Sequence, residues 1–509
     1  MSAAAAGHPS QSPIPFRGLA AFTLYVANLM VTLDMTVANV AVPHIAGNLG
    51  ATLEQGTWVV TSYAVAEAIT VPLTGWLAGR FGAVRLMLTC MAGFTFFSLM
   101  CGLSVTLPML VLFRVGQGLS GGPIMSLVQT LMGRLYTGPD LARAYAVWTL
   151  TVLMGPAMGP IIGGMISDNW SWHWVFFINL PIGVACSVVA YVLLRPAETP
   201  LVRQPIDRIG LALLVVWVGA LQIMLDTGRD RDWFADPTIV ILAATAAIGF
   251  CAFAIWEFTD DHPAVDLRLL RKRPYAMCVT GAAIAFSTHF SSLVVVPQWL
   301  QATMGYSAEQ AGMVMAISAV GSILATQISI RLLVRMDPRI IATAGAIWGG
   351  TVILLRTRWN TELDFTHFAW IFGMQGFGIG MLAVSLNSML MSSLSVEETA
   401  SGIGLLNFIR TMSAAAVTAS MLTFWSGRQA ASRIDMVGSV DYGRTTDVFA
   451  KAGVGAGAGT QIISGMIDRQ ANTIAVLQTF YLAGVVMLVC AAAIWTLPRI
   501  ELNRFKSGK

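Results

Sequence analysis

Long apolar segments run through this chain from near its start to near its end, and they limit its fold more than any other feature. Fourteen windows consist mainly of apolar residues, and each has about the 20 residues that a helix needs to cross a bilayer. Only 11% of the 509 residues are charged, and 56% are hydrophobic. Too few charges remain to cover a surface in water. The sequence therefore predicts an all-α polytopic membrane protein, and it excludes a soluble enzyme or a nucleic-acid-binding protein.

The fourteen expected transmembrane helices can be placed on the sequence to within a few residues at each end. The expected spans are 19–42, 57–78, 86–105, 107–132, 142–167, 174–194, 209–227, 237–257, 275–300, 308–334, 338–355, 365–391, 402–425 and 473–497.

The distribution of Lys and Arg predicts the orientation, because short cytoplasmic loops retain these residues. With the N-terminus inside, cytoplasmic segments contain 19 of the 30 Lys and Arg residues. External segments contain 9, five of them in one long outer loop, 426–472. We therefore expect both termini to be cytoplasmic and this loop to lie outside.

An internal repeat predicts two halves of parallel topology. The fourth and twelfth spans align at a shift of 258 positions, and the matches include two pairs of amide side chains as well as glycines. The organisation that follows is a disordered tail at 1–16, a six-helix bundle at 17–195, two inserted spans within 196–262, a second six-helix bundle at 263–498 and a tail at 499–509. The matched pairs are Gln117 with Gln375, Gly118 with Gly376, Gly122 with Gly380, and Gln129 with Asn387.

Five ionisable residues stand out inside the expected spans, where each is a functional candidate because an unpaired charge there is costly. They are Asp34, Glu67, Arg114, His289 and Arg410.

Asp34 and Arg114 have matching depths. Counted by helical rise, both lie roughly 10 to 12 Å below the outer surface. They could form a permanent ion pair that fixes helix packing. The interpretation we favour is that Asp34 exchanges protons, because burial favours its neutral form, Arg114 favours its charged form, and separating the two residues changes which effect dominates.

The other three candidates leave several roles open. Glu67 could carry a proton, recognise a cationic substrate, or be a protonated acid bonded to a neighbouring helix. Arg410 lies in NFIRTMSAAA, where helix packing and transport fit equally well. His289 titrates near neutrality when water reaches it, but a structural role between Phe286 and Phe290 fits as well.

Two glycine motifs predict close helix packing. In the fifth span, glycines recur every four residues and let another backbone approach, while prolines bend the helix. Between the second and third spans, GWLAGRFGAVR predicts a tight cytoplasmic hairpin that could lock an inner gate. The first motif is Gly155, Pro156, Gly159, Pro160, Gly163 and Gly164, and the hairpin residues are Gly75, Arg80, Gly82 and Arg85.

Together these motifs resemble the major facilitator superfamily. The LDMTVANVAVP segment around Asp34, the fourteen spans and NFIRT near Arg410 resemble its drug:proton antiporter branch with fourteen spans, the EmrB/QacA type. The resemblance extends over 16–498. One departure concerns the hairpin, where the superfamily usually has an acid before the first arginine and this chain has Gly79.

The resemblance implies a fold and a function. The fold is the major facilitator fold, with two six-helix bundles and two inserted spans. The function is proton-driven export of lipophilic toxic compounds by alternating access across the bacterial inner membrane. Asp34 would then be the proton site with Arg114 as its partner, and 155–164 would be the antiporter motif. From its position inside a span, and not from the resemblance, we also count Glu67 among the expected proton-coupling residues.

Further expectations concern the ligands and partners. The proton is the expected coupling ion, with no metal or cofactor. The resemblance also implies two partners, a periplasmic adaptor and an outer-membrane channel. The alternatives are an exporter or importer of a specific metabolite on the same fold, a membrane-embedded enzyme and a non-transporting scaffold. We expect substrate to bind between the halves, in a cavity lined by Gln117, His289, Gln375, Asn387 and Arg410 and near Glu67.

Overall fold

Every regular element in the described part of the chain is a helix. The computed structural model describes residues 16–495 apart from 137, 200, 202–204, 206, 261–262, 334, 396–397 and 440–455. The expected tails at 1–16 and 499–509 therefore lie outside the described residues, except for Phe16.

The first half of the chain contains eight α-helices, two of which are shorter than ten residues. They are α1 (Arg17–Asn48), α2 (Leu53–Thr70), α3 (Thr74–Phe81), α4 (Ala83–Gly102), α5 (Leu107–Leu135), α6 (Gly138–Asn169), α7 (Trp174–Phe177) and α8 (Asn179–Leu193).

The rest of the described chain forms α9 to α15 and α17, and its short 3-10 helices include η4 (Arg356–Arg358), after α13. The α-helices are α9 (Arg208–Thr227), α10 (Pro237–Thr259), α11 (Arg273–Met304), α12 (Ala308–Leu333), α13 (Pro338–Leu355), α14 (Phe365–Ser392), α15 (Thr399–Ser439) and α17 (Ala456–Ile494).

Eleven segments of the described chain are helices long and apolar enough to cross a membrane. These include α9, α10 and the continuous stretch that α7 and α8 form together. Helix α5 is not among the eleven. Its Arg114 and Gln117 are polar and lower the mean hydropathy of an otherwise apolar helix. The chain is therefore an all-helical, multi-pass membrane protein.

Two expected spans are interrupted near prolines. The segment 57–78 divides into α2 and α3 around Pro72, and 174–194 divides into α7 and α8 close to Pro181. Proline has no backbone N–H to donate, so it cannot complete the helical hydrogen-bond pattern. Apolar windows alone do not reveal such breaks.

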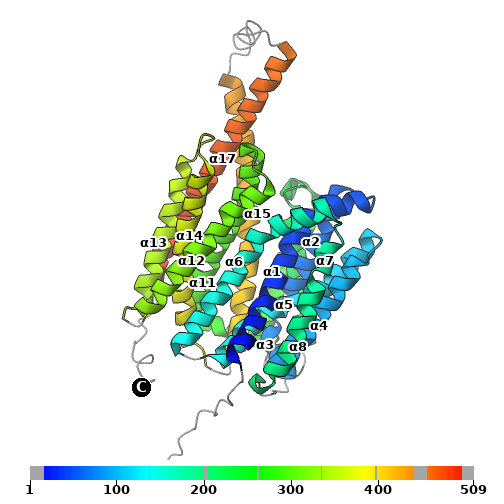
Figure 1. Cartoon of the computed structure of the whole chain (residues 1–509), viewed down its shortest axis with the longest axis vertical. Coiled ribbons are helices and arrows are strands. Elements are labelled where there is room, and N and C mark those ends of the chain that lie inside the picture. Colours follow the sequence, from blue (N-terminus) through cyan, green and yellow to red (C-terminus); the bar gives the residue numbers. More distant parts are fainter. Residues whose placement is uncertain are drawn as a thin grey trace, which may run out of the picture.

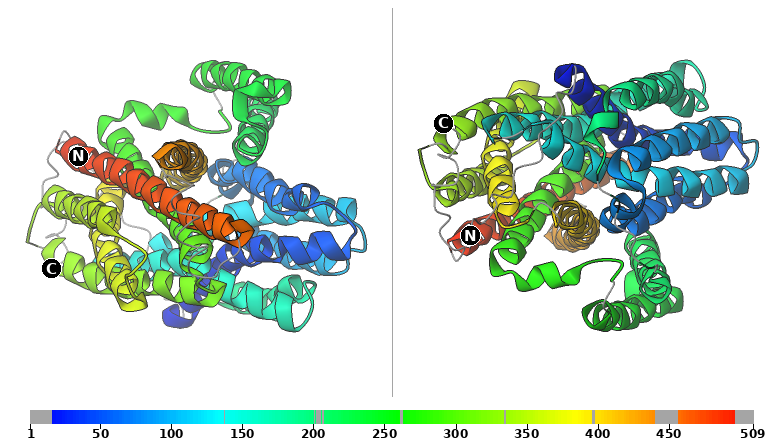
Figure 2. Two further views of the ribbon diagram at one scale, coloured as in Figure 1. Left: turned by 90° about the horizontal axis from the view of Figure 1, so that it is seen from above. Right: turned by 90° about the horizontal axis from the view of Figure 1, so that it is seen from below.

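The helices pack mainly within two groups. In the first, α1 lies against α6 and α8, and α5 lies against α2 and α4. In the second, α14 lies against α12 and α13, and α15 lies against α11 and α17. Figures 1 and 2 show these groups side by side, with the α9–α10 pair at the edge. Only 22% of the α10 span is buried, so this pair leaves most of its apolar surface uncovered.

The two groups also touch each other. Helix α6 contacts α12 and α14, and α15 contacts α3 and α5.

Helices α15 and α17 continue well beyond the expected spans. The segment 426–472 was expected to be an outer loop, but 426–439 extends α15 and 456–472 belongs to α17. Arg433 Nε and Asp468 Oδ1 join the two extensions over 2.5 Å. The pair projects beyond the other helices in Figure 1. We call it the projecting hairpin, and we call its end of the molecule the hairpin end. The opposite end, where α3 meets α4 at Gly82, is the Gly82 end.

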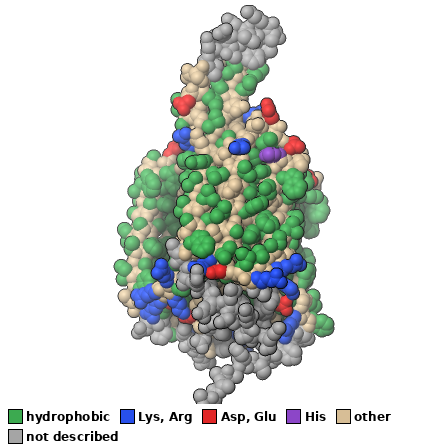
Figure 3. All heavy atoms as spheres, turned by 90° about the vertical axis from the view of Figure 1, so that its left-hand side faces the viewer, with side chains coloured by type: hydrophobic (Ala, Val, Ile, Leu, Met, Phe, Trp, Pro, Cys, Tyr) green, Lys and Arg blue, Asp and Glu red, His purple; other side chains and the backbone are tan. Residues whose placement is uncertain are grey.

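One face of the molecule shows a surface suited to lipid. Figure 3 shows hydrophobic side chains over the middle of this face and Lys and Arg side chains gathered toward its lower edge. Large exposed side chains of the protein include Trp348, Trp370 and Val489. Such apolar area is costly in water and stable against acyl chains.

The repeat in the sequence has a counterpart in the packing. A Cβ atom added to Gly122 would lie 2.7 Å from the carbonyl oxygen of Glu67 on α2. One added to Gly380, the matched position, would lie 2.7 Å from the carbonyl oxygen of Ser322 on α12. Glycines at equivalent positions of α5 and α14 thus permit two equivalent close helix contacts.

Candidate functional site

A buried ion pair joins α1 to α5. Arg114 Nη1 lies 2.5 Å from Asp34 Oδ2, and both side chains are 0% exposed. The structure therefore brings together two residues that are 80 positions apart in the sequence. Removing one member of such a pair leaves an uncompensated buried charge, at a cost of about 3–5 kcal/mol.

Amide side chains complete the coordination of Asp34. Gln117 Nε2 and Asn179 Nδ2 donate to Asp34 Oδ1 over 2.9 and 2.7 Å. Asn179 Nδ2 also donates to Ser98 Oγ over 3.0 Å, and Gln117 Oε1 accepts from Arg114 Nη1 over 2.8 Å. Together with Arg114, these donors give both oxygens of the Asp34 carboxyl group a hydrogen-bond partner. We call Asp34, Arg114, Gln117 and Asn179 the Asp34 cluster.

The backbone of α2 holds the guanidinium in place. Arg114 Nε donates to the carbonyl oxygen of Val59 over 2.9 Å, and its guanidinium carbon lies 4.2 Å from the centroid of the Tyr63 ring. Gly118, one turn further along α5, lies directly against the backbone of Tyr63. A larger residue at this position would separate the two helices and remove both contacts.

Glu67 lies on the same stretch of α2, one turn after Tyr63. Its side chain is partly exposed, and the charges of Arg114 and Asp34 act on it. Glu67 therefore shares the electrostatic environment of the Asp34 cluster without bonding to it.

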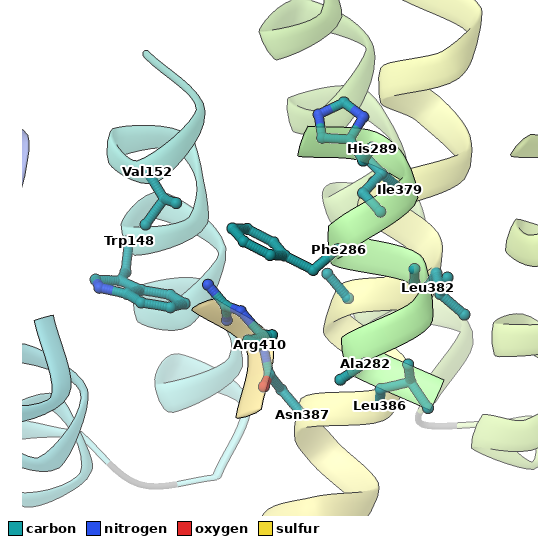
Figure 4. A pocket seen from close by; sticks show the side chains of 12 residues that line it. Trp148, Val152, Ala282, Phe286, His289, Ile379, Leu382, Leu386, Asn387 and Arg410 are labelled. Carbon is teal, nitrogen blue, oxygen red and sulfur yellow. The ribbon is translucent and has the colours of Figure 1, made fainter. Parts of the chain in front are cut away.

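A hollow lies between the two groups of helices. Helix α6 forms one wall, and α11, α14 and α15 form the others. Figure 4 shows His289 toward one end of the hollow and Asn387 toward the other. The lining consists of Trp148, Val152, Ala282, Ala285, Phe286, His289, Ile379, Leu382, Ala383, Leu386, Asn387 and Arg410.

Arg410 brings a positive charge to this mainly apolar hollow. Its guanidinium carbon lies 4.0 Å from the ring centroid of Phe286 and 5.6 Å from that of Trp148, and Figure 4 shows the side chain between these two rings. None of the ion pairs found among the described residues involves Arg410. Aromatic faces stabilise a cation.

The two matched glutamines lie outside the hollow. Gln117 belongs to the Asp34 cluster, and Gln375 accepts a hydrogen bond from Arg356 Nη2. Of the residues expected in the substrate cavity, the structure therefore brings His289, Asn387 and Arg410 to the hollow, and it places Gln117 and Gln375 in the cores of the two halves.

Sequence reasoning did not single out Asn179 or Arg356. Asn179 was part of an expected span, and an amide in an apolar window was the available signal. Arg356 lies one residue beyond an expected span and was counted among the outer loop residues, yet it is 0% exposed. Span ends placed from hydropathy are uncertain by a few residues, which concealed this burial.

The glycines of α6 lie against α1. A Cβ atom at Gly155 would be 2.6 Å from Thr32 Cβ, one at Gly159 would clash with Thr36, and one at Gly163 would be 3.0 Å from the carbonyl oxygen of Val37. Thr36 Oγ1 donates to the carbonyl oxygen of Gly155 over 3.0 Å. Gly164 has open space around it, and the side chains of Pro156 and Pro160 lie outside the described part of the structure.

An acid from a distant segment reaches the hairpin between α3 and α4, whose own sequence motif has no acid. Gly82 has φ +90°, a conformation that favours glycine. Glu198, from the segment after α8, accepts from the backbone N–H groups of Val84 and Arg85 over 2.9 and 3.1 Å. A carboxylate thus occupies the start of α4. The first arginine of the motif, Arg80, lies near the rings of Trp76 and Phe81.

The two halves meet closely at the Gly82 end. A Cβ atom at Gly75 would lie 2.5 Å from the Cα atom of Ser401 on α15. Deeper inside, Asn407 Nδ2 donates to Gln129 Oε1 over 2.7 Å and to Ser126 Oγ over 3.1 Å. These contacts join α3 and α5 to α15 and close the space between the halves.

An ion pair fixes the junction before α15. Lys272 Nζ lies 2.6 Å from Glu398 Oε1. This ammonium and the backbone N–H of Ser395 hold the pKa of Glu398 below its ordinary value. The described residues contain no group of three His, Cys, Asp or Glu side chains that could hold a metal ion.

Comparisons with known proteins place this arrangement in a family. The family model described as Major Facilitator Superfamily matches residues 24–418. Multidrug export protein EmrB of Escherichia coli (strain K12) is 38% identical over 478 residues, which are 93% of each chain. The protein of the same name from Haemophilus influenzae is 40% identical over 414 residues, 81% of each chain.

A solved structure shows the same fold at low sequence identity. The human organic anion transporter MFSD10 (TETRAN) superposes with a TM-score of 0.60 at 13% identity, over 94% of this chain and 100% of that one. The family match covers most of the chain, and two relatives are similar over most of their own length. The chain therefore belongs to the major facilitator superfamily, as a member of the EmrB type.

Proposed function

We propose that this protein is a proton-coupled multidrug exporter that moves hydrophobic toxic compounds across the bacterial inner membrane by alternating access. The observation that carries the proposal is the Asp34 cluster. The ion pair at its centre, between Asp34 and Arg114, is 0% exposed and lies within the first group of helices. The relatives named as multidrug export proteins support the export of many compounds.

In this proposal the chain crosses the membrane fourteen times. The pairs α2–α3 and α7–α8 each count as one span, α9 and α10 are the inserted spans, and two six-helix bundles enclose the hollow. Both termini lie in the cytoplasm, so the Gly82 end faces the cytoplasm and the projecting hairpin faces outward. The basic residues of the short loops support this orientation.

The cycle couples the ion pair to the movement of the halves. With the hollow open to the cytoplasm, a lipophilic compound binds between the bundles, among the residues around Arg410 and His289. The Gly82 end then closes through contacts such as Asn407 with Gln129. A proton that reaches Asp34 from outside weakens its attraction to Arg114 and favours release, and the empty carrier returns and loses the proton inside.

The proposal is tested with the purified protein in liposomes. An imposed pH gradient drives accumulation of a fluorescent lipophilic dye, and a protonophore abolishes it. Accumulation that continues with the gradient collapsed contradicts proton coupling. A metabolite importer, a membrane-embedded enzyme or a non-transporting scaffold would give no gradient-driven movement of the dye.

We further propose that the projecting hairpin docks an EmrA-like periplasmic adaptor, which leads to an outer-membrane channel. Arg433 and Asp468 tie its two helices together, so it presents a defined surface. Deleting part of 435–459 is expected to reduce adaptor-dependent efflux in cells more than transport by the purified protein. Equal losses in the two assays contradict the docking role.

A further inference from the structure

Arg356 is a second buried guanidinium, and it lacks the counter-charge that Arg114 has. Its side chain is 0% exposed, and Nη2 donates to Gln375 Oε1. Its Nε and Nη1 atoms are buried without a hydrogen-bond partner. No carboxylate of the described residues forms an ion pair with it.

Comparing the two repeats shows which position of the second half lacks the carboxylate. At the shift of 258 positions, Gln375 corresponds to Gln117, Phe372 to Arg114 and Ser292 to Asp34. Both halves therefore place a guanidinium beside the matched glutamine, although Arg356 comes from the end of α13. The second half has a buried serine where the first half has its carboxylate.

The surroundings of Arg356 supply N–H groups and aromatic walls, but no negative charge. The guanidinium carbon lies 4.1 Å from the centroid of Phe372 and 5.4 Å from that of Trp359. The Trp359 Nε1 atom is also buried without a partner. Unpaired polar groups and charges are costly inside a protein, so a negative group entering this place would be strongly bound.

His289 is a further buried group of the second half that has no hydrogen-bond partner. It is 2% exposed, and neither ring nitrogen has a partner. The charge of Arg356 acts on it, and its side chain also lines the hollow (Figure 4).

We propose that Arg356, Gln375 and His289 form an anion-binding site in the second half, which takes a compact monovalent anion. The anion is a chloride ion from solution or the carboxylate group of a small organic acid. The site goes beyond the proposed export, because binding at Arg356 requires neither a proton at Asp34 nor transport.

The test is the thermal stability of the full-length protein in detergent, since a ligand that binds only the folded state raises Tm. Chloride replaces gluconate at constant ionic strength, and butyrate, with uncharged butyramide as its control, tests the carboxylate. We expect an anion at about 100 times its Kd to raise the Tm of the wild type by about 2–4 °C. Arg356→Gln and Arg356→Met remove the buried charge, so both are expected to lose this shift while remaining folded.

The matched control is Arg433→Gln, which removes an exposed guanidinium and should keep the full shift. A shift with chloride that depends on Arg356 identifies an inorganic anion site, and a shift with butyrate alone identifies a site for the acid group of an organic ligand. Equal shifts in wild type and both Arg356 variants, or no shift with either anion, overturn the proposal. None of these results depends on whether the protein couples transport to protons.

Discussion

At the scale of single residues, buried and interfacial charges define the chemistry of this protein. The Asp34 carboxylate accepts hydrogen bonds from several side chains. The Arg356 guanidinium donates to Gln375, and its Nε and Nη1 atoms have no acceptor among the described residues. The same fold therefore contains a guanidinium paired with a carboxylate in one half and a guanidinium without a carboxylate in the other. Burial makes the difference energetically important, because charges in a low-dielectric interior interact strongly.

Glu398 gives a prediction for the pH dependence of stability. Its pKa is lowered, first by Lys272 and then by the N–H of Ser395, so its contribution is present above its ordinary pKa of 4.5 and is lost as pH falls through the lower folded value. Glu398→Gln is expected to lower the free energy of unfolding by less than about 1 kcal/mol at pH 7. Unfolding in denaturant at several pH values measures the difference.

The matched control is Glu362→Gln, whose exposed side chain forms no ion pair among the described residues. It should leave stability unchanged at every pH. If the effect of Glu398→Gln grows as pH falls below 4.5, the assignment of the ion pair is wrong.

Some site residues could be found from the sequence and others could not. Asp34 and Arg114 were found because ionisable residues are rare in apolar windows and because their depths agree. Glu198 could not be found, because it is 114 positions away from Val84, whose backbone N–H donates to it. The two residues meet only when the segment after α8 folds back onto the α3–α4 hairpin. A short motif carries no information about such a distant partner.

At the scale of helices, the contact between α1 and α6 depends on small residues. Gly155→Ala places a methyl group 2.6 Å from Thr32 Cβ and 2.9 Å from the carbonyl carbon of Thr32. We expect this variant to lose about 1–3 kcal/mol of stability through overpacking, measured by thermal unfolding in detergent. Gly164→Ala on the same helix meets open space and should have little effect, and equal losses would contradict the packing argument.

Helix boundaries show the limit of hydropathy as a predictor. The expected spans 338–355 and 365–391 agree with α13 and α14 to within one residue, because charged or polar residues border them. By contrast, α15 continues 14 residues past the expected end at 425. The extension is stabilised by contacts between the two helices of the projecting hairpin, including Arg433 with Asp468, and a window of polar residues does not reveal these contacts.

At the scale of the whole molecule, close contact between the halves at the Gly82 end gives a conformational prediction. Gly75→Ala places a Cβ atom 2.5 Å from Ser401 Cα and 2.8 Å from its nitrogen, so the closed arrangement becomes strained. The population should shift toward the state open at this end. With native cysteines replaced, Asn387→Cys in the hollow reports the shift through faster labelling by a membrane-impermeant maleimide applied from that side.

Gly79→Ala is the control for this shift, because it lies on the same helix and has open space around it. The expected acceleration for Gly75→Ala is about 5- to 150-fold, which corresponds to a cost of about 1–3 kcal/mol. Unchanged labelling in Gly75→Ala would show that the contact with Ser401 does not hold this end closed.

The arrangement of the halves was partly accessible from the sequence. Matched amides and glycines indicated the repeat, and the close contacts of Gly122 and Gly380 are its packing equivalents. The contact between Gln129 and Asn407 was not accessible, because it joins residues 278 positions apart that occupy different places in the two halves.

The central claim is that protonation of Asp34 couples the pH gradient to export, and Asp34→Asn in liposomes tests it most directly. Because this substitution leaves Arg114 without its counter-charge, the double variant Asp34→Asn, Arg114→Gln is measured beside it, and Asp435→Asn at an exposed position serves as the control. We predict that both cluster variants still exchange dye between equal pH values and that neither accumulates dye against a gradient. Gradient-driven accumulation at the wild-type rate by either cluster variant would contradict the account.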